Sequence, residues 1–322
     1  MLEKLGSSGF SYRRPWIWTK RKSKQADDIL AVMESRRDYW PMTLRGVMYP
    51  LIHSDVMDSW YWHWGGKQID IYNALSPLLK WMRIDKMIPW NAIIDDHRHV
   101  IYAERFSNAQ QFIEQEVDGF LTGFSRCLAQ GQPRHIELWI EKNTLAHVLK
   151  PIALKYCRRL VVCRGYNSIT FQSDFHARAM AAMDAEQIPT VLYFGDHDPS
   201  GRNMLHAAKQ TIETELGLYG VEYYRAGINE DHFSLIPVNP VPPKMTDTRS
   251  ERFIDEYGPD CYELDALHPK ELQKIAETAI VELSDMEIYE KHYEKGVDEA
   301  IKIEDLRYEI IDFIEDETRN FG

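Results

Sequence analysis

Two acidic residues, separated by one position, form the strongest chemical signal in the sequence. Asp196 and Asp198 lie between an apolar run at residues 190–193 and a helix pattern at residues 202–216. Side chains two positions apart in an extended turn point the same way, so both carboxylates can face one cation. Their oxygens suit Mg²⁺ or Mn²⁺ rather than Zn²⁺. The alternative is an ordinary turn after a strand, where Asp, Pro and Gly are common without any metal.

A second apolar run upstream also ends in a carboxylate. The run at residues 136–140 is followed by Glu141 and then by a helix pattern at residues 144–156, and a third apolar run occupies residues 160–163. This alternation of strands and helices predicts a parallel sheet. Ligands of open parallel sheets bind at the carboxyl ends of the strands, so we expect Glu141 to converge there with the two aspartates.

The three segments in this order resemble the Toprim domain of topoisomerases and related nucleases. They read WIEKNTL around Glu141, VCRGYNS around Gly165 and GDHDPSG around the aspartates. In particular they resemble the A subunit of topoisomerase VI, the meiotic double-strand-break transesterase, and the small stand-alone A-subunit-like proteins of bacteria, plasmids and phages. The resemblance covers residues 141–201. It implies Mg²⁺, or Mn²⁺ in its place, held by Glu141, Asp196 and Asp198.

The resemblance also implies an N-terminal winged helix with a nucleophilic tyrosine. The segment MTLRGVMYPLI, residues 42–52, resembles the helix of this family in which an Arg precedes the active Tyr by four positions. These positions are Arg45 and Tyr49, and their spacing places both side chains on one helical face. An Arg there would bind a phosphate and favour the phenolate. The alternative is an amphipathic core helix in which Tyr49 is half buried and only packs.

Two groups of basic residues are candidates for binding DNA phosphates. A basic aromatic arm at the N-terminus contains Arg21, Lys22 and Lys24, and a helix pattern at residues 71–82 has Lys80 and Arg83 off its apolar face or at its end. The alternative for the arm is a solvated tail. The segment that follows the helix pattern, residues 87–96, suits a short strand or wing. It departs from the topoisomerase VI pattern. An ATPase B-type subunit is therefore a possible partner, but the sequence does not imply one.

Composition limits the class of protein. The chain has 322 residues, 44% of them hydrophobic, which is enough for two domains with their own cores. The net charge of −12 argues against a general DNA coat protein, although the acidic excess lies at the C-terminal end and the N-terminal 50 residues are basic. Four cysteines without CxxC pairing are typical of a reducing cytoplasm. No apolar run approaches the roughly 18 residues that span a bilayer, so we expect no membrane partner.

The sequence and the resemblance together imply an α/β protein of several parts. The expected parts are a basic arm at residues 1–25, a winged-helix domain at 26–100, a helical connector at 101–132, and a Toprim domain with a Rossmann-like parallel sheet and C-terminal helices at 133–322. Within the last part, Glu263 or Asp265 is a further candidate for the metal site, because the segment around them resembles one in the small relatives.

The implied function is Mg²⁺-dependent cleavage of duplex DNA by tyrosine transesterification, as in a topoisomerase. Tyr49 would attack a phosphodiester and form a phosphotyrosyl link, helped by Arg45 and by the metal residues. One tyrosine cuts one strand, so a double-strand break implies a homodimer, in which Tyr49 of one protomer reaches the metal site of the other. Two alternatives stay open: a hydrolytic Toprim nuclease in which Tyr49 only packs, and a non-catalytic winged-helix DNA-binding protein.

Overall fold

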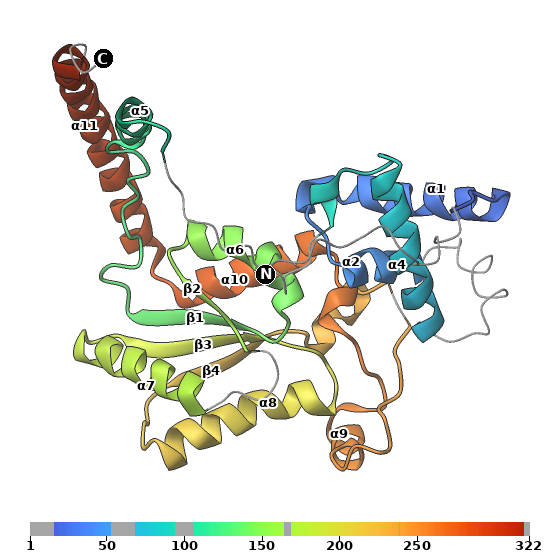
Figure 1. The fold of residues 1–322 in the computed structure, drawn as a ribbon. Coiled ribbons are helices and arrows are strands. Elements are labelled where there is room, and N and C mark those ends of the chain that lie inside the picture. Colours follow the sequence, from blue (N-terminus) through green and yellow to red (C-terminus); the bar gives the residue numbers. More distant parts are fainter. Residues whose placement is uncertain (1–15, 53–67, 94–105, 164–168, 238, 319–322) are drawn as a thin grey trace, which may run out of the picture. The chain divides into compact units, whose positions relative to one another are not determined.

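The computed structural model describes most of the chain outside a few short segments. The described residues are 16–52, 68–93, 106–163, 169–237 and 239–318. The chain divides into two compact units, Met1–Asp95 and Asp96–Gly322, which run from blue to cyan and from green to red in Figure 1. Among the described helices, none is long and apolar enough to cross a membrane.

The N-terminal unit is helical in its described part. Its helices are α1 (Lys20–Ser35), α2 (Leu44–Ile52) and α4 (Gln68–Ile84), with 3₁₀ turns at Arg37–Tyr39 and Trp90–Ala92. Apolar residues recur every three or four positions along each helix and are buried in one shared core, for example Ile29, Val47 and Leu75. Helix α1 begins at Thr19, whose side chain accepts a hydrogen bond from the backbone N–H of Lys22 at 3.3 Å.

The prediction of a short strand or wing at residues 87–96 is wrong for residues 87–93, the described part of this segment. Pro89 begins a 3₁₀ turn that is closed by a hydrogen bond of 3.1 Å from the backbone N–H of Ala92 to the carbonyl of Pro89. Within the described residues of this segment, one isolated parallel bridge joins Ile93 to Met42. The last three residues of the expected strand lie outside the described residues.

The C-terminal unit contains a four-stranded parallel sheet. Its strands are β1 (Arg134–Ile140), β2 (Arg159–Val162), β3 (Ile188–Phe194) and β4 (Glu222–Gly227), in the order β2-β1-β3-β4. All neighbouring strands run parallel, which confirms the predicted α/β class. Strand β1 pairs with β3 so that Ile140 lies opposite Phe194, and the two strands end level with each other.

Helices cover both faces of this sheet (Figure 1). One face carries α6 (Ala146–Lys155) and α10 (Pro269–Leu283), and the other carries α7 (Ile169–Asp184) and α8 (Pro199–Gln210). Side chains of a strand alternate between the two faces. On β1, therefore, Ile136, Leu138 and Ile140 join the core under α6 and α10, whereas Trp139 joins the core under α7 and α8.

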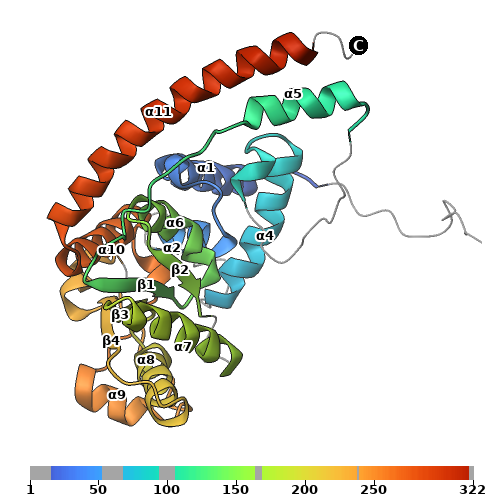
Figure 2. The ribbon, with the colours of Figure 1, turned by 90° about the vertical axis from the view of Figure 1, so that its left-hand side faces the viewer.

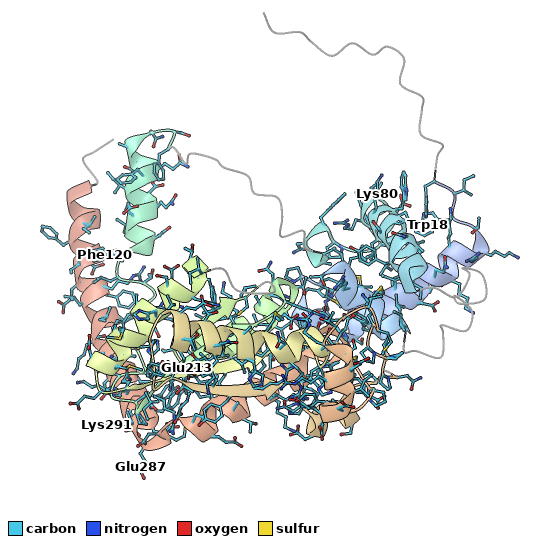
Figure 3. The ribbon with its side chains drawn as sticks, turned by 90° about the horizontal axis from the view of Figure 1, so that it is seen from below. Trp18, Lys80, Phe120, Glu213, Glu287 and Lys291 are labelled. Carbon is cyan, nitrogen blue, oxygen red and sulfur yellow. The ribbon has the colours of Figure 1, made fainter. Side chains whose placement is uncertain are left out.

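Three more helices of this unit lie outside the layers. They are α5 (Ala109–Gly119), α9 (Ser250–Tyr257) and α11 (Met286–Thr318). Figure 2 shows α5 alongside α11. After α5, the carbonyl of Phe120, labelled in Figure 3, accepts a hydrogen bond of 2.8 Å from Arg307 Nε. Arg126 adds an ion pair of 2.8 Å with Glu299, and such contacts hold the connector to α11.

Most of the elements predicted from the sequence are present. The three predicted strands are β1, β2 and β3, the confirmed helix patterns correspond to α2, α4, α6 and α8, and the predicted C-terminal helices are α10 and α11. In the described part of the helical connector predicted at residues 101–132, only α5 is an α-helix. Beyond α5, Leu121 and Gly123 have φ of 53° and 77°, which no continuing helix allows.

Candidate active site

The candidate active site lies where β1 and β3 end. The backbone N–H of Glu141, the first residue after β1, donates to the carbonyl of Phe194 at 2.9 Å, so Glu141 lies beside the start of the GDHD turn. Glu141 Oε2 then accepts two hydrogen bonds, from the backbone N–H of Asp196 at 3.1 Å and from Tyr193 Oη at 3.2 Å. The structure therefore places Glu141 next to Asp196.

This close approach depends on two glycines. A Cβ added at Gly195 would lie 2.7 Å from Glu141 Oε2 and 2.6 Å from Tyr193 Oη, and a Cβ at Gly201 would lie 2.3 Å from the carbonyl oxygen of Asp196. Real side chains do not approach so closely, so each position requires the absence of a side chain. The glycines of GDHDPSG thus shape the turn that carries both aspartates.

Asp198 begins helix α8. Its Oδ1 accepts a hydrogen bond of 2.6 Å from the backbone N–H of Gly201, and Pro199 follows as the first helical residue. Aspartate before a first-turn proline is a favourable helix start, because it satisfies an otherwise unpaired N–H. Asp198 therefore has a structural role that the metal prediction does not require. This role matches the alternative of an ordinary turn and leaves the metal prediction untested.

The three carboxylates share one pattern of hydrogen bonds. Each fixes one oxygen to a backbone N–H: Glu141 to Asp196, Asp196 Oδ1 to Leu264 at 2.7 Å, and Asp198 to Gly201. Their other oxygens, namely Glu141 Oε1, Asp196 Oδ2 and Asp198 Oδ2, accept no hydrogen bond from any residue that the structure describes. Three oxygens without donors are available for a cation.

The negative charges at this site are crowded. Burial raises the pKa of Asp196 to about 7, and the charge of Glu141 also raises it although Lys142 opposes the change. Burial likewise raises the pKa of Glu141, and the nearby charge of Asp198 adds to that rise. These mutual effects show that the three carboxylates lie close enough to repel one another, so that added positive charge would stabilise them.

One positive charge is already present, on Lys142. Its Nζ lies 2.9 Å from Asp196 Oδ1, 3.1 Å from Glu263 Oε2 and 3.2 Å from Asp265 Oδ2. Burial alone would lower the pKa of Lys142, but these three carboxylates raise it well above its usual value. The ammonium is therefore permanently charged. No role was predicted for Lys142, whose one signal in the sequence is its position directly after Glu141.

Glu263 and Asp265 reach the site through a bridge between two loops. His197 and Tyr262 exchange backbone hydrogen bonds of 2.8 Å and 3.0 Å, and this pairing places the 262–265 segment against the GDHD turn. Asp265 is only 4% exposed, and its Oδ2 accepts no hydrogen bond. The ammonium of Lys142 is thus the charge that balances this buried carboxylate.

Arg225 on β4 holds the turn from behind. Its guanidinium donates to the carbonyls of Gly195 at 2.8 Å and Asp196 at 2.5 Å, and also to those of Gly201 at 3.0 Å and Ile228 at 3.1 Å. Burial lowers the pKa of Arg225 to about 10, so it still carries a charge at neutral pH. This contact could not be expected from the sequence, because β4 was not predicted.

The histidine between the two aspartates does not belong to the acidic group. His197 is fully buried and packs edge-on against Phe233 and Phe253. Its Nδ1 accepts hydrogen bonds from the guanidinium of Arg202. Burial, with the positive charges of Arg202 and Arg225, lowers the pKa of His197 to about 3, so the ring is neutral and is no proton donor at neutral pH.

The predicted nucleophile and its partner lie on α2 of the N-terminal unit. Tyr49 is 6% exposed and belongs to the core of that unit, whereas Arg45, one turn earlier, is exposed. The buried ring agrees with the alternative in which Tyr49 packs. An attack on DNA by Tyr49 would start from this buried position.

The predicted DNA-binding residues lie on two helices of the same unit. Arg21, Lys22 and Lys24, from the last part of the predicted basic arm, belong to the first turns of α1. Lys80 and Arg83 are on α4, half-buried against aromatic rings, and Lys80 is labelled in Figure 3. Arg21 and Lys24 are exposed and Lys22 lies over the ring of Trp16.

The donor set suits a hard divalent cation, but it is not arranged as a ready-made metal site. Among the residues that the structure describes, no group of three or more His, Cys, Asp or Glu side chains could hold a metal ion as it stands. The ammonium of Lys142 lies among the carboxylates instead. The fit rests on the three carboxylate oxygens without donors, which are the ligand type that Mg²⁺ prefers.

The sequence was also compared with known proteins. It matches no protein-family model and no curated protein. The resemblance of the three motifs to Toprim domains therefore stays a prediction from the sequence.

Proposed function

We propose that this protein cleaves duplex DNA in a reaction that depends on Mg²⁺ or Mn²⁺. The observation that supports it best is the meeting of Glu141 and Asp196 at the level ends of two parallel strands, with Asp198 close enough to raise the pKa of Glu141. This is the edge of an open sheet where ligands bind. The proposal includes a Toprim-like C-terminal unit and a winged-helix-like N-terminal unit, as the sequence motifs imply.

In this proposal the three carboxylates hold the metal ion through their oxygens without donors. A divalent ion there supplies positive charge to the phosphate that is cleaved. The backbone N–H groups of Asp196, Leu264 and Gly201 hold the opposite oxygens and so limit the rotation of each carboxylate. Arg225 keeps the turn itself in place.

Tyr49 is the proposed nucleophile. Its hydroxyl loses a proton to solvent, the phenolate oxygen attacks phosphorus, and the bond from phosphorus to one sugar oxygen breaks. That oxygen then takes up a proton, and the DNA end stays linked to the tyrosine. Arg45 is exposed one helical turn away, where its guanidinium can bind the phosphate and favour the phenolate.

The proposal includes a homodimer on duplex DNA, since each tyrosine cuts one strand. Phosphates along the duplex would contact the basic residues of α1 and α4, which are Arg21, Lys22, Lys24, Lys80 and Arg83. Such contacts give affinity with little sequence preference. The acidic C-terminal helices would stay away from the DNA backbone.

A second candidate function is hydrolytic cleavage at the same carboxylates. One observation favours it: the ring of Tyr49 is 6% exposed and packs in a core, which suits a structural residue better than a nucleophile. In that case water attacks the phosphate and no covalent link forms. Both candidates require the carboxylates and differ only in Tyr49.

A cleavage assay separates the two candidates. Plasmid DNA is incubated with Mg²⁺ or Mn²⁺, the reaction is stopped with detergent, and the products are analysed with and without protease. Transesterification predicts protein-linked ends from the wild type and no cleavage by Tyr49→Phe, whose ring still packs. Hydrolysis predicts free ends from both proteins.

Asp196→Asn is the control for the shared proposal. It should lower cleavage by about a hundredfold or more, because a ligand that neutralises transition-state charge is lost. If Asp196→Asn cleaves at the wild-type rate, the carboxylates do not hold a catalytic metal ion and both candidates are wrong.

A further inference from the structure

Among the described residues, Lys142 forms an ion pair with a carboxylate of the predicted metal residues, that of Asp196. We propose that its ammonium is a resident counter-ion of the site, which competes with the divalent ion for Asp196 and thereby sets the metal affinity. The proposal rests on the proposed function, because it presupposes that Asp196 is a metal ligand. It adds a residue that controls how the site is loaded.

The positions of the contacts support competition. Residues 141 and 142 continue from β1 in an extended conformation, with φ of −103° and ψ of 119° at Lys142, so their side chains point to opposite sides. Glu141 meets the backbone N–H of Asp196 on one side, and Lys142 meets Asp196 Oδ1 on the other. Asp196 is therefore the carboxylate that the metal site and the ammonium share.

The contacts also explain where the ammonium stays when it leaves Asp196. Glu263 and Asp265 lie 3.1 Å and 3.2 Å from the same Nζ. Asp265 is buried, and its Oδ1 accepts a hydrogen bond of 3.4 Å from Thr144 Oγ1. These two carboxylates retain Lys142 beside the site, so a metal ion at Asp196 Oδ2 weakens one of three contacts of the ammonium, the one with Oδ1 of the same carboxylate.

This arrangement accounts for the absence of a ready-made metal cluster among the described residues. Metal ligands must point their free oxygens at one place, and a bound ammonium draws Asp196 toward the 262–265 segment instead. Two positive charges close to one carboxylate also repel each other. Removal of the lysine charge should therefore strengthen metal binding, whereas a purely structural lysine would leave it unchanged or weaken it.

The test is the binding of Mn²⁺ to Lys142→Met, measured by calorimetry or by the paramagnetic relaxation of water. Met has a similar length and no charge. We expect Lys142→Met to bind Mn²⁺ about tenfold more tightly than the wild type, because one competing charge is gone. Lys155→Met is the matched control: Lys155 pairs with Glu277 away from the site and should leave the Mn²⁺ affinity unchanged.

A second variant protects the test from a folding defect. Lys142→Met leaves Asp265 buried without a counter-charge, so Lys142→Met combined with Asp265→Asn removes both charges and keeps their volumes. The rise in Tm on adding Mn²⁺ should be larger in this double variant than in Asp265→Asn alone. Equal rises in both proteins would overturn the proposal.

The outcomes also separate this proposal from the proposed function. If neither the wild type nor Lys142→Met binds Mn²⁺, the metal site itself is wrong. If the wild type binds Mn²⁺ and Lys142→Met binds it equally or more weakly, the metal site stands and competition by Lys142 is refuted.

Discussion

The raised pKa of Asp196 predicts that this residue destabilises the metal-free fold. In Asp196→Asn the side chain keeps its shape and loses the charge. The pKa of Asp196 is about 7 in the folded protein and has an ordinary value of 3.8. Between these two values the folded state binds the proton that the unfolded state has lost, so the stability of the wild type falls as the pH rises through this window. The variant lacks this loss.

The magnitude follows from the two pKa values. Their difference corresponds to about 4 kcal/mol of destabilisation above pH 7. The attraction of Lys142 is already part of this folded-state pKa, so its loss in the variant is not subtracted again. We therefore expect Asp196→Asn to be more stable than the wild type by about 4 kcal/mol at about pH 8, a rise in Tm of about 10 °C.

Thermal unfolding in the presence of a chelator measures this difference. The advantage of Asp196→Asn should shrink as the pH is lowered and vanish near about pH 3, where the wild-type carboxyl is largely protonated in both states. Asp174→Asn, at an exposed position of α7, is the control and should show no such dependence. If Asp196→Asn is less stable than the wild type at both pH values, the ionised carboxylate of Asp196 does not destabilise the folded protein.

Two further predictions concern shape and charge. Gly201→Ala should destabilise the protein by about 3 kcal/mol in chemical denaturation, because the added Cβ meets the carbonyl of Asp196. Gly119→Ala is the control: it has open space around it and should not destabilise the protein. Equal effects of the two substitutions would contradict the close approach at Gly201. Replacement of Arg21, Lys22 and Lys24 of α1 by Ala should lower the salt dependence of DNA binding. The slope of the log of the binding constant against log[salt] should fall in magnitude by about 3. The control replaces Lys291, Lys295 and Lys302 of α11 by Ala and should leave this slope unchanged.

The sheet could be predicted from the sequence where its strands are apolar. Strands β1, β2 and β3 are short apolar runs that end in polar residues, and their order along the chain indicates a parallel sheet. Strand β4, by contrast, reads EYYRAG, and its charged residues Glu222 and Arg225 interrupt the apolar residues. Such a strand has no apolar run to reveal it.

The acidic part of the site was predictable for a topological reason, and the basic part was not. Carboxyl ends of neighbouring parallel strands always meet, so Glu141 and Asp196 could be placed together without knowing any contact. The role of Lys142 depends on Glu263, 121 positions later. The role of Arg225 depends on a strand that the sequence pattern hides. Contacts between distant segments leave no periodic signal.

The bridge between His197 and Tyr262 can form only after the strands of the sheet have been synthesised. The ribosome completes β1, β3 and β4 before it reaches residues 262–265. Until then, Lys142 can pair with Asp196 but not with Glu263 or Asp265. In a fragment that ends after β4, Lys142 would permanently lack Glu263 and Asp265 as partners. A minimal domain cut at the end of the sheet would therefore keep Glu141 and both aspartates of the turn, yet carry an ammonium that no other carboxylate draws away from them.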